Sequence, residues 1–112
     1  MTMNGKIENG RLLQKFKQYL LLEKALSHNT LDAYAHDVER LLGYLETEEI
    51  HPTDVTLEVL EAFLATLHDE QIRARSQARM LSGIRAFYRY LVLDGYIEAD
   101  PTLLLESPKI GM

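Results

Sequence analysis

The chain contains no cysteine and no tryptophan, and only three of its 112 residues are proline. Without cysteine it can form neither disulfides nor thiolate metal sites. No apolar run approaches the roughly 20 residues that a membrane-spanning helix requires, and the N-terminus lacks a signal-peptide pattern. We therefore expect a soluble, cytoplasmic protein that makes no contact with a membrane.

Motifs that carry chemistry are missing as well. The sequence has no glycine-rich phosphate loop, no His-x-x-x-His pair and no Gly-x-Ser-x-Gly turn. Its four histidines do not recur at metal-ligand spacing. We expect Tyr34 and Tyr88 to pack in the core, and Tyr44 and Tyr90 to lie at the surface or rim. The chain is therefore expected to hold no catalytic residue, no metal and no cofactor.

Acidic residues are absent from one stretch of an otherwise acidic chain. The net charge is −5, yet residues 72–93 contain five arginines and neither aspartate nor glutamate. The other residues include seven basic and seventeen acidic side chains. A positive stripe on an acidic protein indicates an anionic partner that is met by one face only.

Helical geometry places this stripe on one side of a single helix. At about 100° per residue, four arginines fall with Ser82 in an arc of about 120°, and small residues lie between them. Apolar side chains occupy the opposite arc. Like charges four residues apart are mildly destabilising, and no local acid relieves them here. A solvated charged face is the simple alternative to an anion-binding face. The four arginines are Arg75, Arg79, Arg85 and Arg89.

Four amphipathic segments predict helices, and no segment is typical of a strand. Residues 1–10 show no periodicity and are interpreted as a flexible leader. Gly95 is well placed to end the last helix. The expected helices cover residues 11–24, 30–47, 56–70 and 76–94. The expected N-caps are Asn29 or Thr30, Asp54 or Thr56, and Ser76.

Two of these segments resemble the tyrosine recombinases of the phage integrase family. The family segment Asn-Thr-x-x-x-Tyr-x-x-Asp-Leu is matched by Asn29-Thr-Leu-Asp-Ala-Tyr-Ala-His-Asp-Val. The segment Ser-x-x-Arg-x-Leu-Ser-x-Ile-Arg-x-Phe-Tyr-x-Phe-Leu is matched by Ser76-Gln-Ala-Arg-Met-Leu-Ser-Gly-Ile-Arg-Ala-Phe-Tyr-Arg-Tyr-Leu. Asp100-Pro101 stands where the family often has Asn-Pro. The match covers nearly the whole chain, and the most similar group is the XerC/XerD-like integrases of bacteria.

The resemblance implies an N-terminal core-binding domain over residues 11–108. Its fold would be all-α, a SAM-like bundle of four main helices in two crossed helical hairpins. In the family this domain forms one jaw of a clamp around duplex DNA, and a separate catalytic domain forms the other jaw. Residues 109–112 would begin the linker to that absent domain. The fragment would be a monomer and no enzyme, whereas the full-length protein would be a tyrosine recombinase, tetrameric on paired DNA sites.

The resemblance also implies that the start of the second helix and the outer face of the fourth contact DNA. Because the arginines point away from the core, we expect Arg79→Ala and Arg85→Ala not to lower the melting temperature. Gln77 lies on the opposite arc and is the weakest member of the set. The second helix lacks the basic residues that the family often has after its tyrosine, so it is expected to contribute little beyond its N-terminus. The implied DNA-binding residues are His28, Asn29, Thr30, Arg75, Gln77, Arg79, Ser82, Arg85 and Arg89.

Two other functions suit the same residues. SAM-like helical domains often bind proteins, so the arginine face would also suit an acidic protein partner. A small free-standing DNA-binding regulator is the second alternative. What the gene encodes after residue 112 would separate both from a recombinase.

Overall fold

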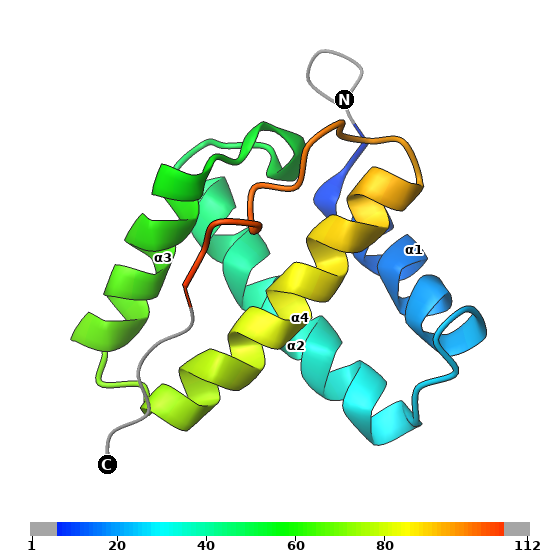
Figure 1. Ribbon diagram of the computed structural model, residues 1–112, viewed down its shortest axis with the longest axis horizontal. Coiled ribbons are helices and arrows are strands. Elements are labelled where there is room, and N and C mark those ends of the chain that lie inside the picture. The colour runs from blue at the N-terminus through cyan, green and yellow to red at the C-terminus, as the bar shows by residue number, and fades with distance from the viewer. Residues whose placement is uncertain (1–6, 107–112) are drawn as a thin grey trace.

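The computed structural model describes residues 7–106, which form four α-helices joined by short connections (Figure 1). Within this range no strand occurs. The prediction of an all-α, SAM-like helical bundle is therefore confirmed. The elements are α1 (Asn9–Leu22), α2 (His28–Thr47), the 3-10 turn η2 (Pro52–Asp54), α3 (Leu57–Asp69) and α4 (Ala74–Leu93).

The predicted domain boundaries fall mostly beyond the described part of the chain. Helix α1 begins at Asn9, so the last two residues of the expected leader are helical. Residues 1–6 lie outside the described residues, and so do the expected end of the domain at residue 108 and the linker at 109–112. The leader and the linker stay predictions.

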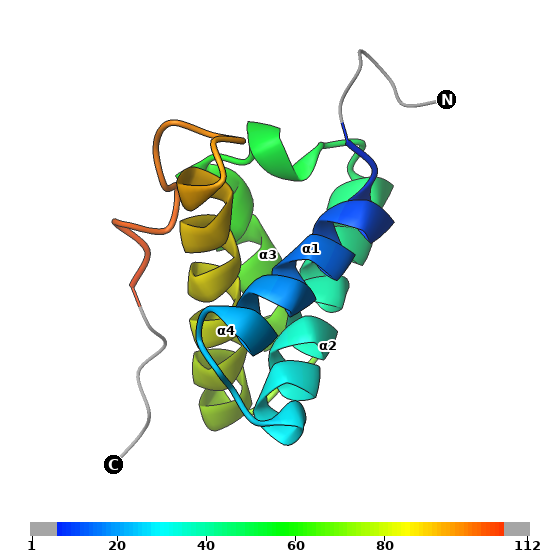
Figure 2. The ribbon, with the colours of Figure 1, turned by 90° about the vertical axis from the view of Figure 1, so that its right-hand side faces the viewer.

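The helices are arranged as two hairpins that cross. Helices α1 and α2 form one hairpin, α3 and α4 form the other, and α4 crosses α2 (Figure 1). The segment that follows α4 turns back and passes between α3 and α4 in this view. The N-terminal ends of α2 and α4 lie at the same end of the molecule in both views (Figures 1 and 2). This arrangement brings the two segments singled out in the sequence to one end of the bundle.

The core is filled by the apolar stripes of all four helices. Phe87 of α4 is fully buried, and its ring meets the ring of Phe16 edge-on at a centroid distance of 5.3 Å. Tyr88 packs against Phe87 in the same way at 5.2 Å. Gly83 lies where α4 crosses α2, and a Cβ atom there would stand 3.5 Å from the backbone of Tyr34. A Cβ atom at Gly83 would therefore be in ordinary van der Waals contact with α2, and a larger side chain would meet the α2 backbone.

Two of the expected N-caps differ from those in the structure. Helix α2 is capped by Ser27, whose Oγ accepts a hydrogen bond from the Thr30 amide at 3.3 Å, so the expected cap at Asn29 or Thr30 is wrong. Helix α4 begins after Arg73, which provides no side-chain cap, and Ser76 lies inside the helix. The intervening alanine and arginine are good helix formers, which favours the earlier start. Thr56 caps α3 as expected.

Helices α2, α3 and α4 end in the same backbone motif, in which a residue with positive φ follows the helix. Of these three ends, only that of α4 has glycine at this position. Gly95 follows α4 with φ at 80°, and the next amide, that of Tyr96, donates to the Leu91 carbonyl at 2.9 Å. Glu49 and Gln71 occupy the equivalent positions after α2 and α3, with φ at 59° and 62°. A side chain in this left-handed region costs about 1–2 kcal/mol. Gly95 therefore ends α4 as predicted, at a lower conformational cost.

Candidate nucleic-acid interface

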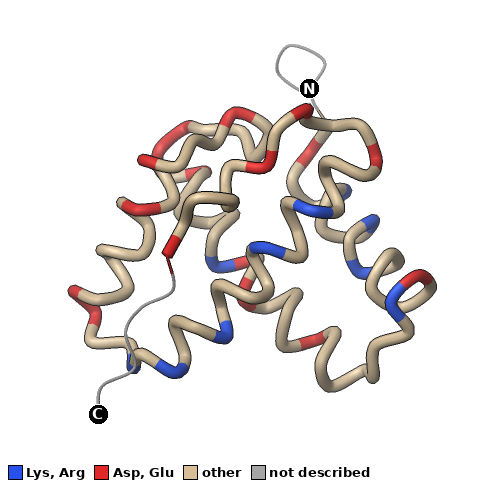
Figure 3. The backbone as a smooth tube through the Cα atoms, in the orientation of Figure 1, with Lys and Arg blue, Asp and Glu red and all other residues tan. Residues whose placement is uncertain are grey.

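The outward face of α4 carries basic side chains without any acid from the same helix. Arg75, Arg79, Ser82 and Arg89 are exposed, and Arg85 is half-buried. Figure 3 shows the basic positions spaced along α4, whereas acidic positions follow α3 and the connection before it. The expected arginine face is therefore present, and its positive charge contrasts with the acidic residues of α3.

Arg75 and Arg89 make no ion pair with any residue in the described range, although both are exposed. They stand near the beginning and near the end of α4. A guanidinium that no carboxylate neutralises keeps its full charge for an external anion. These two residues are the plainest anion-binding candidates on the face.

Arg79 is held by a buried carboxylate from α2. Its Nε donates to Asp37 Oδ2 at 3.1 Å, and its Nη2 donates to Asp37 Oδ1 at 2.8 Å. The Asp37 side chain is 1% exposed, whereas that of Arg79 is 53% exposed. Hydrogen bonding to Asp37 raises the pKa of Arg79 above its ordinary value. The inner edge of Arg79 thus neutralises a buried charge, which argues against the expectation that Arg79→Ala leaves the melting temperature unchanged.

Asp37 is not among the functional residues predicted above, although its position in the sequence marks it as unusual. Asp37 stands three residues after Tyr34 and four before Leu41, in phase with the apolar stripe of α2. A carboxylate on the buried stripe of an amphipathic helix needs a cationic partner or hydrogen-bond donors. The sequence does not show which residue supplies that partner.

Arg85 contacts the segment that follows α4. Its Nη2 donates to the Leu105 carbonyl at 2.6 Å, and the Leu105 side chain is only 5% exposed. The contact joins two residues that are 20 positions apart in the chain. Arg85 thus helps to hold the exit segment against α4, a role that helical periodicity cannot reveal.

Gln77 does not belong to the outward face. It is 7% exposed, and its Nε2 donates to the Ile72 carbonyl at 2.7 Å, just before α4 begins. The inclusion of Gln77 among the DNA-binding residues is therefore corrected. Its position on the arc opposite the arginines already made it the weakest of the set.

The start of α2 offers exposed polar groups at the end of the molecule where α4 also begins. His28, Asn29 and Thr30 form the first turn of this helix, and all three are exposed. The first amides of a helix lack intrahelical acceptors, and the helix dipole favours anions there. The expected DNA-binding residues of α2 therefore stand where a phosphate would be favoured.

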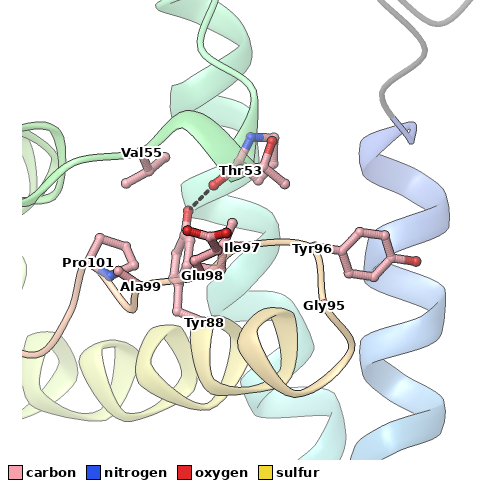
Figure 4. A pocket seen from close by; sticks show the side chains of 10 residues that line it. Thr53, Val55, Tyr88, Gly95, Tyr96, Ile97, Glu98, Ala99 and Pro101 are labelled. Carbon is pink, nitrogen blue, oxygen red and sulfur yellow. Dashed lines mark hydrogen bonds between the residues drawn. The ribbon is translucent and has the colours of Figure 1, made fainter.

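The two tyrosines near the end of α4, Tyr88 and Tyr90, are buried. Tyr88 is fully buried and donates its hydroxyl hydrogen to the Pro52 carbonyl at 2.9 Å, beside a hollow between η2 and the exit segment (Figure 4). Tyr90 is 7% exposed, so its expected place at the rim is wrong: α1 covers it, and its ring lies 5.1 Å from that of Tyr19. Burial raises the pKa of both phenols. Ionisation of either one near neutral pH is therefore disfavoured.

Residues 7–106 contain no group of histidine, aspartate and glutamate side chains that could hold a metal ion. No helix in this range is long and apolar enough to cross a membrane. In Figure 4, the Tyr96 side chain points away from the hollow and toward α1, so its hydroxyl group is directed out of the hollow.

Comparison with known proteins adds to the geometry. Residues 13–95 match the family model described as phage integrase, N-terminal SAM-like domain. The chain is 39% identical over 109 residues to the tyrosine recombinase XerD of Proteus mirabilis, which covers 97% of this chain and 35% of the relative. It is 37% identical over 100 residues to XerD of Pseudomonas aeruginosa, covering 89% of this chain and 34% of the relative.

A third relative extends the similarity to the XerC group. The chain is 35% identical over 98 residues to the tyrosine recombinase XerC of Oceanobacillus iheyensis, covering 87% of this chain and 32% of that protein. In each case this chain spans about a third of the length of the curated relative. With the family model matching residues 13–95 of 112, the chain belongs to the family of phage integrase N-terminal SAM-like domains.

Proposed function

We propose that this chain is the core-binding domain of a tyrosine site-specific recombinase, and that it binds duplex DNA through the outward face of α4 and the first turn of α2. The observation that carries the proposal is the arginine face of α4, which contains no acid and includes two arginines without an ion pair in the described range. An acidic protein that concentrates positive charge on one helix suits a polyanion that approaches from one side.

The length of the chain relative to its relatives supports a division of labour in the whole protein. It corresponds to about a third of each tyrosine recombinase that it matches. The described residues supply an anion-binding face and no assembled catalytic group. The strand cleavage and rejoining of a recombinase would therefore reside in another part of the full protein, which would act as a tetramer on paired DNA sites.

The proposed interface predicts a salt-dependent affinity for DNA. Arg79 is neutralised by Asp37, so two to three arginines are left to meet phosphates. At about 0.9 counterions released per contact, the log–log salt slope should be about −2 to −3. Arg75→Ala and Arg89→Ala should each weaken binding and reduce the magnitude of this slope by about 0.9. Fluorescence anisotropy with a labelled 20-bp duplex at several salt concentrations measures both quantities.

Arg11→Ala is the matched control, because it removes the same charge from exposed α1. It should leave the salt slope unchanged. An amide chemical-shift titration locates the interface independently, and shifts should cluster at residues 28–30 and 75–89. Shifts centred on α1 and α3, or no binding at low salt, would instead favour a domain that binds an acidic protein.

We also expect the isolated chain to be catalytically inert. Tyr88 and Tyr90 are buried with raised phenol pKa values, and their hydroxyl groups donate to the Pro52 carbonyl and to the Asp94 carboxylate. Supercoiled plasmid incubated with the pure protein should stay supercoiled and free of covalent adduct on a denaturing gel. A protein–DNA adduct lost on replacing one tyrosine with phenylalanine would overturn this expectation.

A further inference from the structure

Arg79 differs from the other arginines of the α4 face in charge and in rigidity. Asp37 accepts hydrogen bonds from its Nε and Nη2, which fixes the plane of the guanidinium. Asp37 itself is buried in α2, where it lies beside the α4 backbone at Gly83. Arg75 and Arg89 have no such carboxylate within residues 7–106.

The pairing with Asp37 leaves a defined set of donors for a ligand. A guanidinium has five N–H groups in a fixed fork. Asp37 takes one from Nε and one from Nη2, so both hydrogens of Nη1 and one of Nη2 are unused. These can form the end-on fork, which offers two parallel donors. The side chain is 53% exposed, so solvent or a ligand can reach it.

The charge of the pair decides which acceptor this fork would favour. A phosphate is attracted by net positive charge, and the carboxylate of Asp37 cancels that charge at Arg79. An uncharged pair of acceptors is not repelled by the Asp37 carboxylate. Two acceptors at a fixed spacing also suit a guanidinium whose plane is fixed. Guanine presents such a pair, O6 and N7, in the major groove, and a bidentate arginine is the commonest specific contact to it.

The position of Arg79 in α4 fits contact with a base edge. It is the sixth residue of the helix, and the first turns of a helix inserted into the major groove contact base edges. Its neighbours on the face, Ala78 and Ser82, have small side chains. Small side chains allow the helix backbone to approach the groove, and the major groove is about 12 Å wide, enough for a helix.

Building on the proposed function, we infer that Arg79 is a specificity-determining residue that reads a guanine in the major groove, and that Asp37 is the positioning residue that aims it. Arg75 and Arg89 then supply affinity that does not depend on base sequence. The preference of the domain for its site would thus depend on a pair formed between two helices.

The test uses the 112-residue chain and a library of randomised 20-bp duplexes. Duplexes retained by the wild type are sequenced, and anisotropy is then measured on the enriched duplex and on versions with adenine or 7-deazaguanine at the selected guanine. For the wild type, either change should weaken binding, and the change to adenine should do so about 5- to 150-fold. Replacement by 7-deazaguanine removes only the N7 acceptor, so it isolates the bidentate contact.

Two variants separate base reading from a purely structural role. Arg79→Lys keeps a cation beside Asp37 but lacks the planar fork. A lysine can still contact guanine, so this variant should keep the wild-type salt slope and distinguish the three duplexes less strongly than the wild type does. Asp37→Asn removes the compensating charge. It should therefore bind unrelated duplexes more tightly, with a slope steeper by about one contact, while losing the guanine preference. Thermal melts of both variants fix the temperature at which each is folded.

Several outcomes would overturn the inference. A guanine preference as strong in Arg79→Lys as in the wild type, or an Asp37→Asn variant that is only less stable and binds more weakly, would assign the pair a structural role alone. A wild type that binds duplexes without base preference would sink the inference while leaving the proposed function intact. A wild type that binds no duplex at low salt would sink both.

Discussion

Replacing Phe87 with alanine should lower the free energy of unfolding by about 3–5 kcal/mol. The side chain is fully buried in the C-terminal half of α4, and its ring centroid lies 5.3 Å from that of Phe16 and 5.2 Å from that of Tyr88. Truncation would remove buried apolar surface and leave a cavity between two hairpins that cannot close fully. Domains of this size are stable by about 5–15 kcal/mol. The variant should therefore unfold at a much lower urea concentration, measured by circular dichroism at 222 nm.

Leu104→Ala is a suitable control, because that side chain is 79% exposed. Its effect should stay within about 0.5 kcal/mol. DNA binding by Phe87→Ala should be close to wild type under conditions where the variant is still folded. A loss of stability below about 1 kcal/mol would contradict the packing of Phe87 described above.

Arg79→Ala should also destabilise the protein, by about 1–3 kcal/mol. The substitution leaves the carboxylate of Asp37, which is 1% exposed, without the donors at 3.1 and 2.8 Å. The cost is moderated because Arg79 is half-exposed, so water can replace part of its contribution. Chemical unfolding of Arg79→Ala beside Arg75→Ala makes the comparison, since Arg75 lies on the same face and pairs with no acid in the described range.

A double-mutant cycle isolates the contribution of the pair. Once Asp37→Asn has removed the buried charge, Arg79→Ala should cost much less than it does in the wild type. Additive effects of the two substitutions, or equal stability of Arg79→Ala and Arg75→Ala, would show that the observed hydrogen bonds add nothing measurable to folding.

Several features of this protein follow from local sequence alone. Apolar residues at helical spacing predict the four helices, because each helix must bury one stripe whatever it packs against. Thr56 and Gly95 mark their helix ends because cap conformation depends on a few neighbouring residues. The exposed positions of Arg75, Ser82 and Arg89 follow from the same periodicity. The candidate DNA-binding face was therefore largely predictable as a stripe on one helix.

Only the tertiary structure decides how members of that stripe differ. Arg79 meets Asp37 across 42 positions of sequence, and Arg85 meets the Leu105 carbonyl across 20. Helical periodicity predicts neither contact. The first depends on the crossing of α2 and α4, and the second depends on the return of the exit segment. Tyr90 shows the same limit, since its burial depends on α1 covering the end of α4. Local spacing determines which side of a helix a residue occupies, whereas the packing of helices determines which partners the residue contacts.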